Sequence, residues 1–186
     1  MSFVTSLIAA STFFALTLMG GGLYEYLVVD PFWPRRPDLM VELLVPPEPG
    51  QLRSVDGDRR RYDRELRPGL MLGAIEELRS AGVRADVWKI EGLEERSDCE
   101  AVARLARSGG REEASCVVLG RGADDATVER WLQEAAAVPG YNGFAVGRTI
   151  WWNAVSGHLT EGLPGDTAVE EISRRYRHFI DVYSSV

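Results

Sequence analysis

Lys89 is the single lysine in a chain that carries 21 basic side chains, and every other one is an arginine. A lysine amine can lose its proton in an apolar site and attack a ketone to form an imine, whereas an arginine stays protonated. Lys89 is therefore a candidate nucleophile. The same composition also fits a chain that simply favours arginine, with Lys89 as a solvated or paired side chain.

Two glutamates are candidates to move protons for such a lysine. Glu42 lies inside the apolar run 39–45, and Glu91 lies two residues after Lys89. A carboxylate placed among apolar residues needs a partner or a role, and proton transfer is a role that imine formation and bond cleavage require. The alternative for Glu42 is a salt bridge to an arginine from a neighbouring strand.

Two glycine-flanked arginines, in Gly120-Arg121-Gly122 and in Gly147-Arg148, suggest an anion site. Backbone amides beside glycines, together with a guanidinium group, suit a phosphate. Both arginines could instead tie loops together. The first motif does not complete a dinucleotide fingerprint, because Asp125 stands where the third glycine would be. There is no P-loop either, so no cofactor is expected.

The overall charge and the remaining metal-ligand types exclude several functions. A net charge of −7 argues against nucleic acid as a partner, because phosphate binding needs a basic face. His158 and His178 have no second ligand at a suitable spacing, so no metal site is expected. Cys99 and Cys116 form no disulfide framework and are expected to be small buried core residues.

Short apolar runs alternate with amphipathic stretches from residue 39 to the C-terminus. This alternation predicts parallel β–α units, with a polar loop before the first helix and an irregular stretch containing Trp151 and Trp152 before the last. Ser97 is expected to cap the second helix. The predicted strands are 39–45, 85–90, 115–119 and 143–146, and the predicted helices are 68–81, 97–108, 124–138 and 166–183.

Four such units make an α/β domain that corresponds to the C-terminal half of a (β/α)₈ TIM barrel. A complete barrel needs about 250 residues, more than the chain provides. Barrel active sites lie at the carboxyl ends of the strands, which is where Lys89, Glu91 and the two glycine-flanked arginines are expected. Phosphate often binds after strands seven and eight of a barrel, which would be the last two strands of this chain.

The N-terminal residues differ in character from the rest. Residues 1–29 form an apolar segment, expected to be a helix, and 30–38 form a proline-rich linker to the domain at 39–186. The apolar segment is either a membrane anchor or a packed helix. If it spans a membrane, Arg35 and Arg36 place the domain in the cytoplasm, anchored to the inner face.

Several ungapped motifs resemble one bacterial family. They include Asp86-Val87-Trp88-Lys89-Ile90-Glu91-Gly92-Leu93, Val118-Leu119-Gly120-Arg121-Gly122 and Gly143-Phe144-Ala145-Val146-Gly147-Arg148-Thr149. They are similar to the aldolase-like domain at the C-terminus of some inositol-catabolism kinases, of the 2-deoxy-5-keto-gluconate 6-phosphate aldolase type. Wider relatives are the class I tagatose-bisphosphate aldolases. The resemblance runs from Leu39 nearly to the C-terminus.

The resemblance implies roles for residues already singled out. Lys89 would form the Schiff base with a keto-sugar phosphate, and Glu42 would help to transfer protons. The last two strands would bind the phosphate. The residues implied for it are Gly147 and Arg148, and also Gly120, Arg121 and Gly122.

The chain also departs from the family pattern. The N-terminal half of the family's barrel is absent, and Thr149-Ile150-Trp151-Trp152-Asn153 stands where the family usually has Thr-Phe-Trp-Asp-Pro. A half barrel exposes two sheet edges and an apolar inner face, so it is expected to form a homo-oligomer or to bind a complementary half. The alternative is an inactive remnant or a membrane-tethered module that binds a sugar phosphate.

Overall fold

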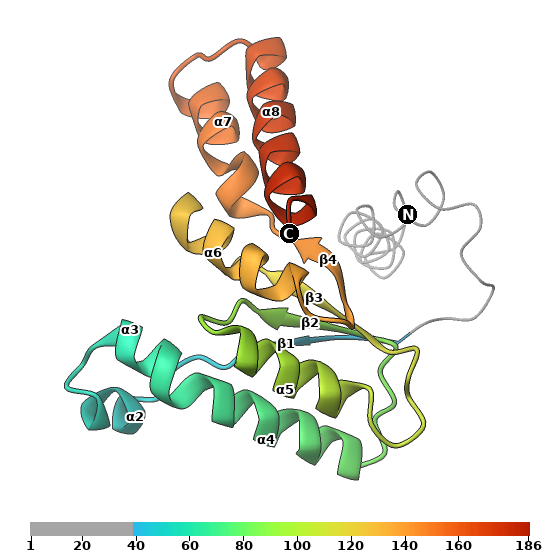
Figure 1. Ribbon diagram of the computed structural model, residues 1–186. Coiled ribbons are helices and arrows are strands. Elements are labelled where there is room, and N and C mark those ends of the chain that lie inside the picture. The colour runs from blue at the N-terminus through green and yellow to red at the C-terminus, as the bar shows by residue number, and fades with distance from the viewer. Residues whose placement is uncertain (1–38) are drawn as a thin grey trace, which may run out of the picture. The chain divides into compact units, whose positions relative to one another are not determined.

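The computed structural model describes residues 39–186, and these form a parallel sheet with helices between its strands (Figure 1). The strands are β1 (Met40–Leu43), β2 (Val87–Glu91), β3 (Ser115–Leu119) and β4 (Tyr141–Ala145). They lie in the order β1-β2-β3-β4, and each neighbouring pair is parallel. The predicted α/β class, with four consecutive strand–helix units, is therefore confirmed.

The apolar segment 1–29, predicted as a helix or anchor, and the linker 30–38 lie outside the described residues. Within 39–186, none of the helices combines the length and the apolar character needed to cross a bilayer.

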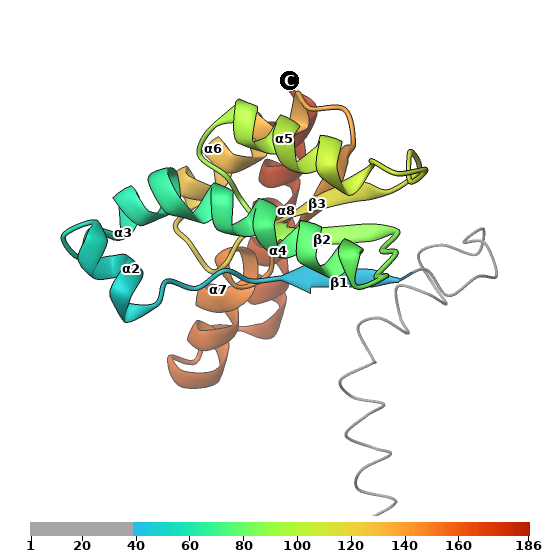
Figure 2. The ribbon, with the colours of Figure 1, turned by 90° about the horizontal axis from the view of Figure 1, so that it is seen from below.

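The helices that connect consecutive strands pack along one face of the sheet (Figures 1 and 2). They are α4 (Arg67–Ser80), α5 (Arg96–Ala106) and α6 (Asp125–Ala136), and α8 (Gly165–Ser184) packs next to α6 after the last strand. Right-handed crossovers between sequential parallel strands place all their helices on the same side. The result is a single layer of helices in the order α4-α5-α6-α8.

The strands divide their side chains between the two faces of the sheet. Trp88 and Ile90 on β2, like Cys116 and Val118 on β3, point into the helix layer and are at most 1% exposed. Side chains at alternate positions point to the opposite face, where Met40 is 58% exposed. Parallel sheets are normally covered on both faces, but within residues 39–186 the helix layer covers only one.

The predicted polar loop before α4 is instead mostly helical. It contains α2 (Pro49–Ser54), α3 (Arg59–Arg61) and a π-helical turn, η2 (Tyr62–Leu66), that leads directly into α4. Asp58 starts α3, because its carboxylate accepts hydrogen bonds from the backbone amides of residues 60 and 61. The many charged residues of the segment 49–66 leave no apolar period, so the sequence did not indicate its helices.

The stretch with two tryptophans, predicted to be irregular, is the helix α7 (Arg148–Thr160). Ile150, Ala154 and Gly157 are its buried residues, and their spacing of four and three places them on one face. The outward-facing tryptophan Trp152 obscured that period in the sequence. The strand before it, β4, also starts two residues earlier than predicted, at Tyr141.

Helix starts were predicted with mixed success. The sequence left Asp124 and Asp125 as alternatives for the start of α6. Asp124 caps the helix, since its carboxylate accepts a hydrogen bond of 2.9 Å from the Thr127 amide. The prediction that Ser97 caps α5 is wrong. That helix begins one residue earlier, at Arg96, after Glu95. The residue before the first helical turn is Glu95, not Ser97, and its backbone is extended.

Gly92, directly after β2, is required by close packing. A Cβ atom at this position would lie 2.4 Å from the ring of Trp131 on α6. Trp131 is fully buried and its indole nitrogen donates a hydrogen bond of 2.9 Å to Glu94. The ring therefore has no room to move away from a side chain at position 92.

We expect Gly92→Ala to lower the free energy of unfolding by about 1–3 kcal/mol, because the added methyl group overpacks the core against Trp131. Gly73→Ala is the matched control. Gly73 is exposed inside α4, and a Cβ added there would have nothing within 4 Å, so alanine should raise the stability by up to about 1 kcal/mol. Urea denaturation of both variants measures the difference, and equal stabilities would contradict the packing argument.

Candidate active site

Lys89 and Glu42 form an ion pair on the uncovered face of the sheet. They are direct partners in the register of β1 and β2, and the Lys89 Nζ lies 2.9 Å from the Glu42 Oε2. The lysine side chain is 20% exposed and the glutamate 45%. The structure thus brings together two of the residues predicted to be catalytic, and the partner of Glu42 is this lysine, not an arginine.

Glu91, the third predicted catalytic residue, belongs to a different set of contacts. It is 3% exposed, although it lies only two residues after Lys89 on the same strand. Its Oε2 accepts a hydrogen bond of 3.0 Å from the Val45 amide. Its carboxylate also lies 3.9 Å from the Arg67 guanidinium and 3.7 Å from that of Arg121. Glu91 therefore ties the end of β2 to the segments beside it.

Asp63 on the π-helical turn is the centre of this buried ionic cluster. It accepts hydrogen bonds of 3.0 and 2.7 Å from both terminal nitrogens of Arg121 and one of 2.9 Å from the Nε of Arg67. The two guanidinium groups also lie 5.5–5.7 Å from the centre of the Trp131 ring. The ionic cluster, formed by Asp63, Arg67, Glu91 and Arg121, joins the connections that follow β1, β2 and β3.

Sequence reasoning did not single out Asp63 or Arg67. The signal was present, since an aspartate and an arginine four residues apart form a pair on one side of a helix. Nothing in the sequence showed that this pair turns inward.

Burial and charge act in opposite directions within the cluster. Burial alone would raise the pKa of Asp63, but the hydrogen bonds and positive charges of Arg121 and Arg67 outweigh it and hold that pKa below its usual value. Burial lowers the pKa of Arg67, whose side chain is 0% exposed, against the attraction of Asp63. The ionised form of Asp63 is thus what compensates the buried Arg67 charge.

The Arg121 side chain, predicted to bind phosphate, is directed to Asp63 and Glu91. Its backbone has a positive φ of 55°, which is uncommon for a residue with a side chain. In this conformation the Arg121 carbonyl accepts a hydrogen bond of 3.2 Å from the Arg148 guanidinium. Arg121 therefore helps to position Arg148.

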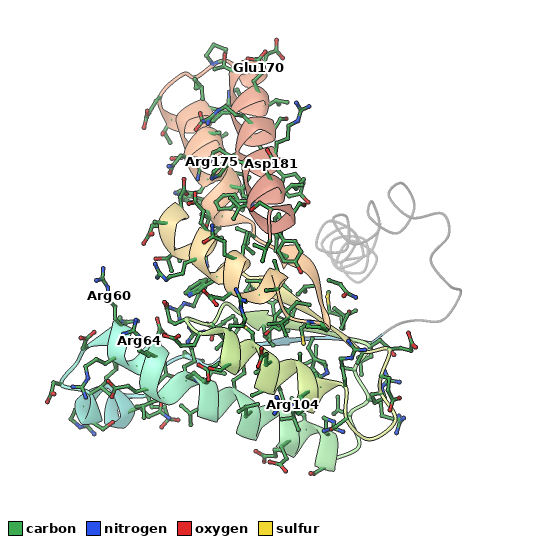
Figure 3. The ribbon with its side chains drawn as sticks, in the orientation of Figure 1. Arg60, Arg64, Arg104, Glu170, Arg175 and Asp181 are labelled. Atoms are coloured by element: carbon green, nitrogen blue, oxygen red, sulfur yellow. The ribbon has the colours of Figure 1, made fainter. Side chains whose placement is uncertain are left out.

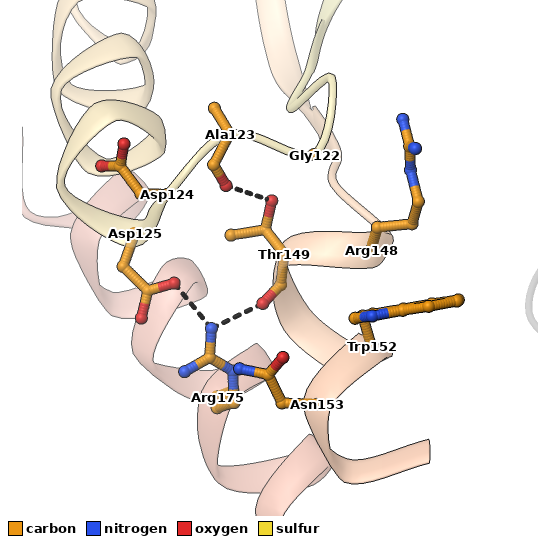
Figure 4. Close-up of a pocket in the computed structure, with 9 residues that line it drawn as sticks. All are labelled: Gly122, Ala123, Asp124, Asp125, Arg148, Thr149, Trp152, Asn153 and Arg175. Atoms are coloured by element: carbon orange, nitrogen blue, oxygen red, sulfur yellow. Dashed lines mark hydrogen bonds and ion pairs between the residues drawn. The ribbon is translucent and has the colours of Figure 1, made fainter. Parts of the chain in front are cut away.

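A cavity of about 620 Å³ lies at the carboxyl ends of β3 and β4 (Figure 4). It adjoins the N-termini of α6 and α7, where free backbone amides and the helix dipoles favour an anion. Gly122 and Arg148, two of the predicted phosphate residues, line it. The other lining residues are Ala123, Asp124, Asp125, Thr149, Trp152, Asn153 and Arg175.

Arg175, on α8, braces the cavity wall. It donates hydrogen bonds to the Asp125 carboxylate at 2.6 Å and to the Thr149 carbonyl at 2.5 Å (Figure 4). It also donates one of 3.0 Å to the carbonyl oxygen of Ile150. The arginine is 16% exposed and is already fully engaged. Of the two arginines that line the cavity, Arg148 is the one with capacity for a ligand.

The two other predicted phosphate residues, Gly120 and Gly147, serve close packing. A Cβ at Gly120 would lie 2.9 Å from Val146, and one at Gly147 would lie 3.2 Å from the indole nitrogen of Trp151. Both glycines flank the cavity without lining it.

The cysteines and histidines are placed as follows. Cys99 and Cys116 are buried, as expected, and burial raises the pKa of each thiol to about 12. His178 pairs with Glu129 at 2.7 Å, and His158 contacts the Leu163 carbonyl. Over the range 39–186, no three His, Cys, Asp or Glu side chains converge to hold a metal ion.

Comparison with known protein families assigns the chain to a group. A family model described as an uncharacterized protein conserved in bacteria, DUF2090, matches residues 59–186. The chain belongs to this family. The match includes Lys89, the ionic cluster and the cavity, whereas Glu42 on β1 precedes it. The comparison with curated proteins found no match.

We expect Asp63→Asn to lower the free energy of unfolding by about 3–5 kcal/mol at neutral pH, because it leaves Arg67 buried without its partner charge. The depressed pKa makes the Asp63 contribution present above the unfolded value of about 4 and lost as the pH falls through the folded value. The difference between wild type and variant should therefore shrink below about pH 4.

Urea denaturation across this pH range tests the prediction. Asp181→Asn is the control, because Asp181 is exposed on α8 and makes no ion pair within the described residues. A constant difference between Asp63→Asn and wild type down to the lowest pH would show that the charge on Asp63 is not what stabilises the cluster.

Proposed function

We propose that this domain is a class I aldolase-like unit that acts on a keto-sugar phosphate through a Schiff base on Lys89. The observation that carries the proposal is the contact of 2.9 Å between the Lys89 Nζ and the Glu42 Oε2 on the uncovered sheet face. An amine nucleophile needs a nearby base to take its proton. Glu42 is the carboxylate within hydrogen-bonding distance of it.

The chemistry follows from these two groups. The neutral Lys89 amine attacks the substrate ketone, and loss of water from the carbinolamine leaves a protonated imine. Glu42 carries the protons that this dehydration needs. Glu42 then takes the proton of the hydroxyl group on the carbon β to the imine. That oxygen becomes the carbonyl of the departing aldehyde, the bond between the α and β carbons breaks, and its electron pair moves into the iminium to form an enamine. Protonation of the enamine and hydrolysis of the imine return free Lys89.

The cavity supports a phosphorylated substrate. It opens at the same end of the sheet as barrel active sites do. Arg148 provides a positive charge there, and the start of α6 and α7 adds backbone amides. Glu91 is buried against Arg67 and Arg121, so we give it a structural role. Glu42 is therefore the proton carrier in this proposal.

The resemblance of the Lys89 motif to inositol-catabolism aldolase domains supplies the substrate class. 2-Deoxy-5-keto-gluconate 6-phosphate is the substrate that it suggests. Membership of the bacterial DUF2090 family is compatible with this proposal, although the family description names no activity.

A second candidate function is binding without turnover. Glu42 is 45% exposed, so water reaches the ion pair freely in a single copy of the domain. The cavity, in contrast, is lined by residues of the loop after β3 and of α6, α7 and α8, and does not need Lys89. The domain would then be a sugar-phosphate-binding module, which residues 1–29 would tether to the inner face of a membrane if they act as an anchor.

Borohydride trapping tests the aldolase proposal. We expect full-length protein incubated with 2-deoxy-5-keto-gluconate 6-phosphate and borohydride to gain a stable secondary-amine adduct on Lys89. Peptide mapping by mass spectrometry can assign it, because Lys89 is the single lysine and the other primary amine, at the N-terminus, lies on a different peptide. Glu42→Gln should slow trapping by about a hundredfold, the scale of a lost proton-transfer group. Its control is Glu112→Gln, in an exposed loop.

Lys89→Arg is the matched control for the adduct. It keeps a positive charge beside Glu42 but cannot form an imine, so the adduct should disappear while the fold is retained. A folded, assembled wild-type sample that gives no adduct on Lys89 would exclude the aldolase function and leave the binding module.

Arg148→Ala tests the cavity separately from the chemistry. We expect it to weaken binding of a sugar phosphate by at least about tenfold, since a charge-assisted hydrogen bond contributes about 1.5–3 kcal/mol. Arg104→Ala is the control, because Arg104 is exposed on α5, away from the cavity (Figure 3). Isothermal titration calorimetry measures both, and equal affinities would remove the cavity from the phosphate site.

A further inference from the structure

Both edges of the sheet are free within residues 39–186. β1 and β4 each pair with one neighbour, so the backbone amides and carbonyls on their outer sides have no strand partner. Beside the β1 edge, Met40 is 58% and Leu44 54% exposed. Free edges that carry apolar side chains are prone to pair with another strand.

The β4 edge is accompanied by an apolar groove along α8. The groove has a volume of about 260 Å³ and lies between β4 and the last helix. Phe144 on β4 and Tyr176, Ile180 and Tyr183 on α8 line it with large apolar side chains, and Asn142 on β4 also lines it. Tyr176 and Ile180 are 48% and 41% exposed although they lie in the middle of a helix.

The exposed apolar side chains of α8 lie on the side that faces away from α6. Arg175 and His178 contact the α6 residues Asp125 and Glu129, so they mark the side that faces α6. Val169, Tyr176 and Ile180 are spaced by seven and four residues, which places them on one stripe of the helix. Val169 is 62% exposed. We call Val169, Tyr176 and Ile180 the α8 stripe.

Helix α4, at the other end of the helix layer, has a matching free side. Arg79 donates a hydrogen bond of 2.8 Å to the Ser108 carbonyl after α5, so it marks the side of α4 that faces α5. Leu70 lies on roughly the opposite side of the helix and is 36% exposed. The helix layer therefore ends in the α8 stripe on one side and in the exposed Leu70 on the other.

We propose that the occupant of both edges is a second copy of this chain. A twofold axis parallel to the strands would place β4 of each copy beside β1 of the other, with the strands still parallel. The same operation would place the α8 stripe beside Leu70 of the partner's α4. One symmetric contact, made twice, thus covers every free edge and closes the assembly, as homodimers commonly do.

The charges on the uncovered face also suit a second copy. Glu42 and Lys89 form an ion pair, so the face carries no net charge from them. Two copies of the face can approach each other without repulsion between unpaired like charges. A partner with a strongly charged surface would gain nothing from this face.

The inference deepens the proposed function, because the second copy forms the wall that is missing over Lys89 and Glu42. The closed interior contains the Lys89–Glu42 ion pair of each copy and excludes bulk water. The uncovered sheet face of the partner then lies opposite each Lys89. Dimer formation can be measured without any substrate. A protein that dimerises but gives no borohydride adduct would therefore refute the aldolase function alone.

Engineered disulfides test the pairing of the edges. We expect full-length protein carrying Met40→Cys or Leu44→Cys together with Ala145→Cys to form disulfide-linked dimers on mild oxidation. Ala145 is exposed on β4 and lies on the same face of the sheet as Met40 and Leu44, as a disulfide requires. Two β1 positions are used because barrel closure sets the register between the copies. A bridge within one chain is excluded, because three strand spacings separate β1 from β4 by roughly 14 Å. The native thiols, buried with a pKa of about 12, stay unreactive.

The single variants are the matched controls. Met40→Cys, Leu44→Cys and Ala145→Cys alone should stay unlinked, because the proposed dimer brings β1 to β4 and never β1 to β1 or β4 to β4. Cross-linking of the single variants to the same extent as the double variants would overturn the proposed arrangement. So would double variants that form no dimer on oxidation.

Substitution of the α8 stripe tests the same surface without a covalent link. Ile180→Glu in the full-length protein should convert a dimer to a monomer in sedimentation experiments in a density-matched mild detergent. Leu159→Glu is the control, because Leu159 is 74% exposed near the end of α7 and away from both edges. Amine-reactive labelling should modify Lys89 several-fold faster in Ile180→Glu than in the control. A monomeric wild type, or a dimer unaffected by Ile180→Glu, would contradict the proposal.

Discussion

The structure depends on the fact that the connections between its parallel strands cross on a single side of the sheet. The side chains of Trp88, Ile90, Cys116 and Val118 meet the helices there and form the core. The alternate side chains are left on the other face, and these include Glu42 and Lys89. The same constraint that builds the core thus presents the ion pair on an open surface, where only a further layer could enclose it.

The ionic cluster then fixes the carboxyl ends of the strands. Asp63 holds Arg121 and Arg67, and Glu91 anchors the chain after β1 through the Val45 amide. Arg121 in turn directs Arg148 through its carbonyl. Arg148 therefore reaches the cavity from a scaffold of buried charges.

The strand–helix alternation could be read from the sequence because each strand is a short apolar run and the helices α5, α6 and α8 have a regular apolar period. The π-helical turn and α7 could not, because charged residues in the first and an exposed tryptophan in the second obscure the period. Asp63 and Arg67 were also missed. A pair four residues apart looks the same in sequence whether it faces solvent or is buried, and only packing against Trp131 distinguishes the two.

The sequence by itself determined the α/β class, the order of the units, and the choice of Lys89, Glu42 and Glu91 as candidate residues, since these follow from local pattern and residue chemistry. The tertiary structure decided which charges meet. Strand register brings Lys89 to Glu42, while helix packing draws Glu91 and Arg121 into the ionic cluster. Contacts between residues far apart in the chain depend on how the layers pack, and no local pattern encodes that packing.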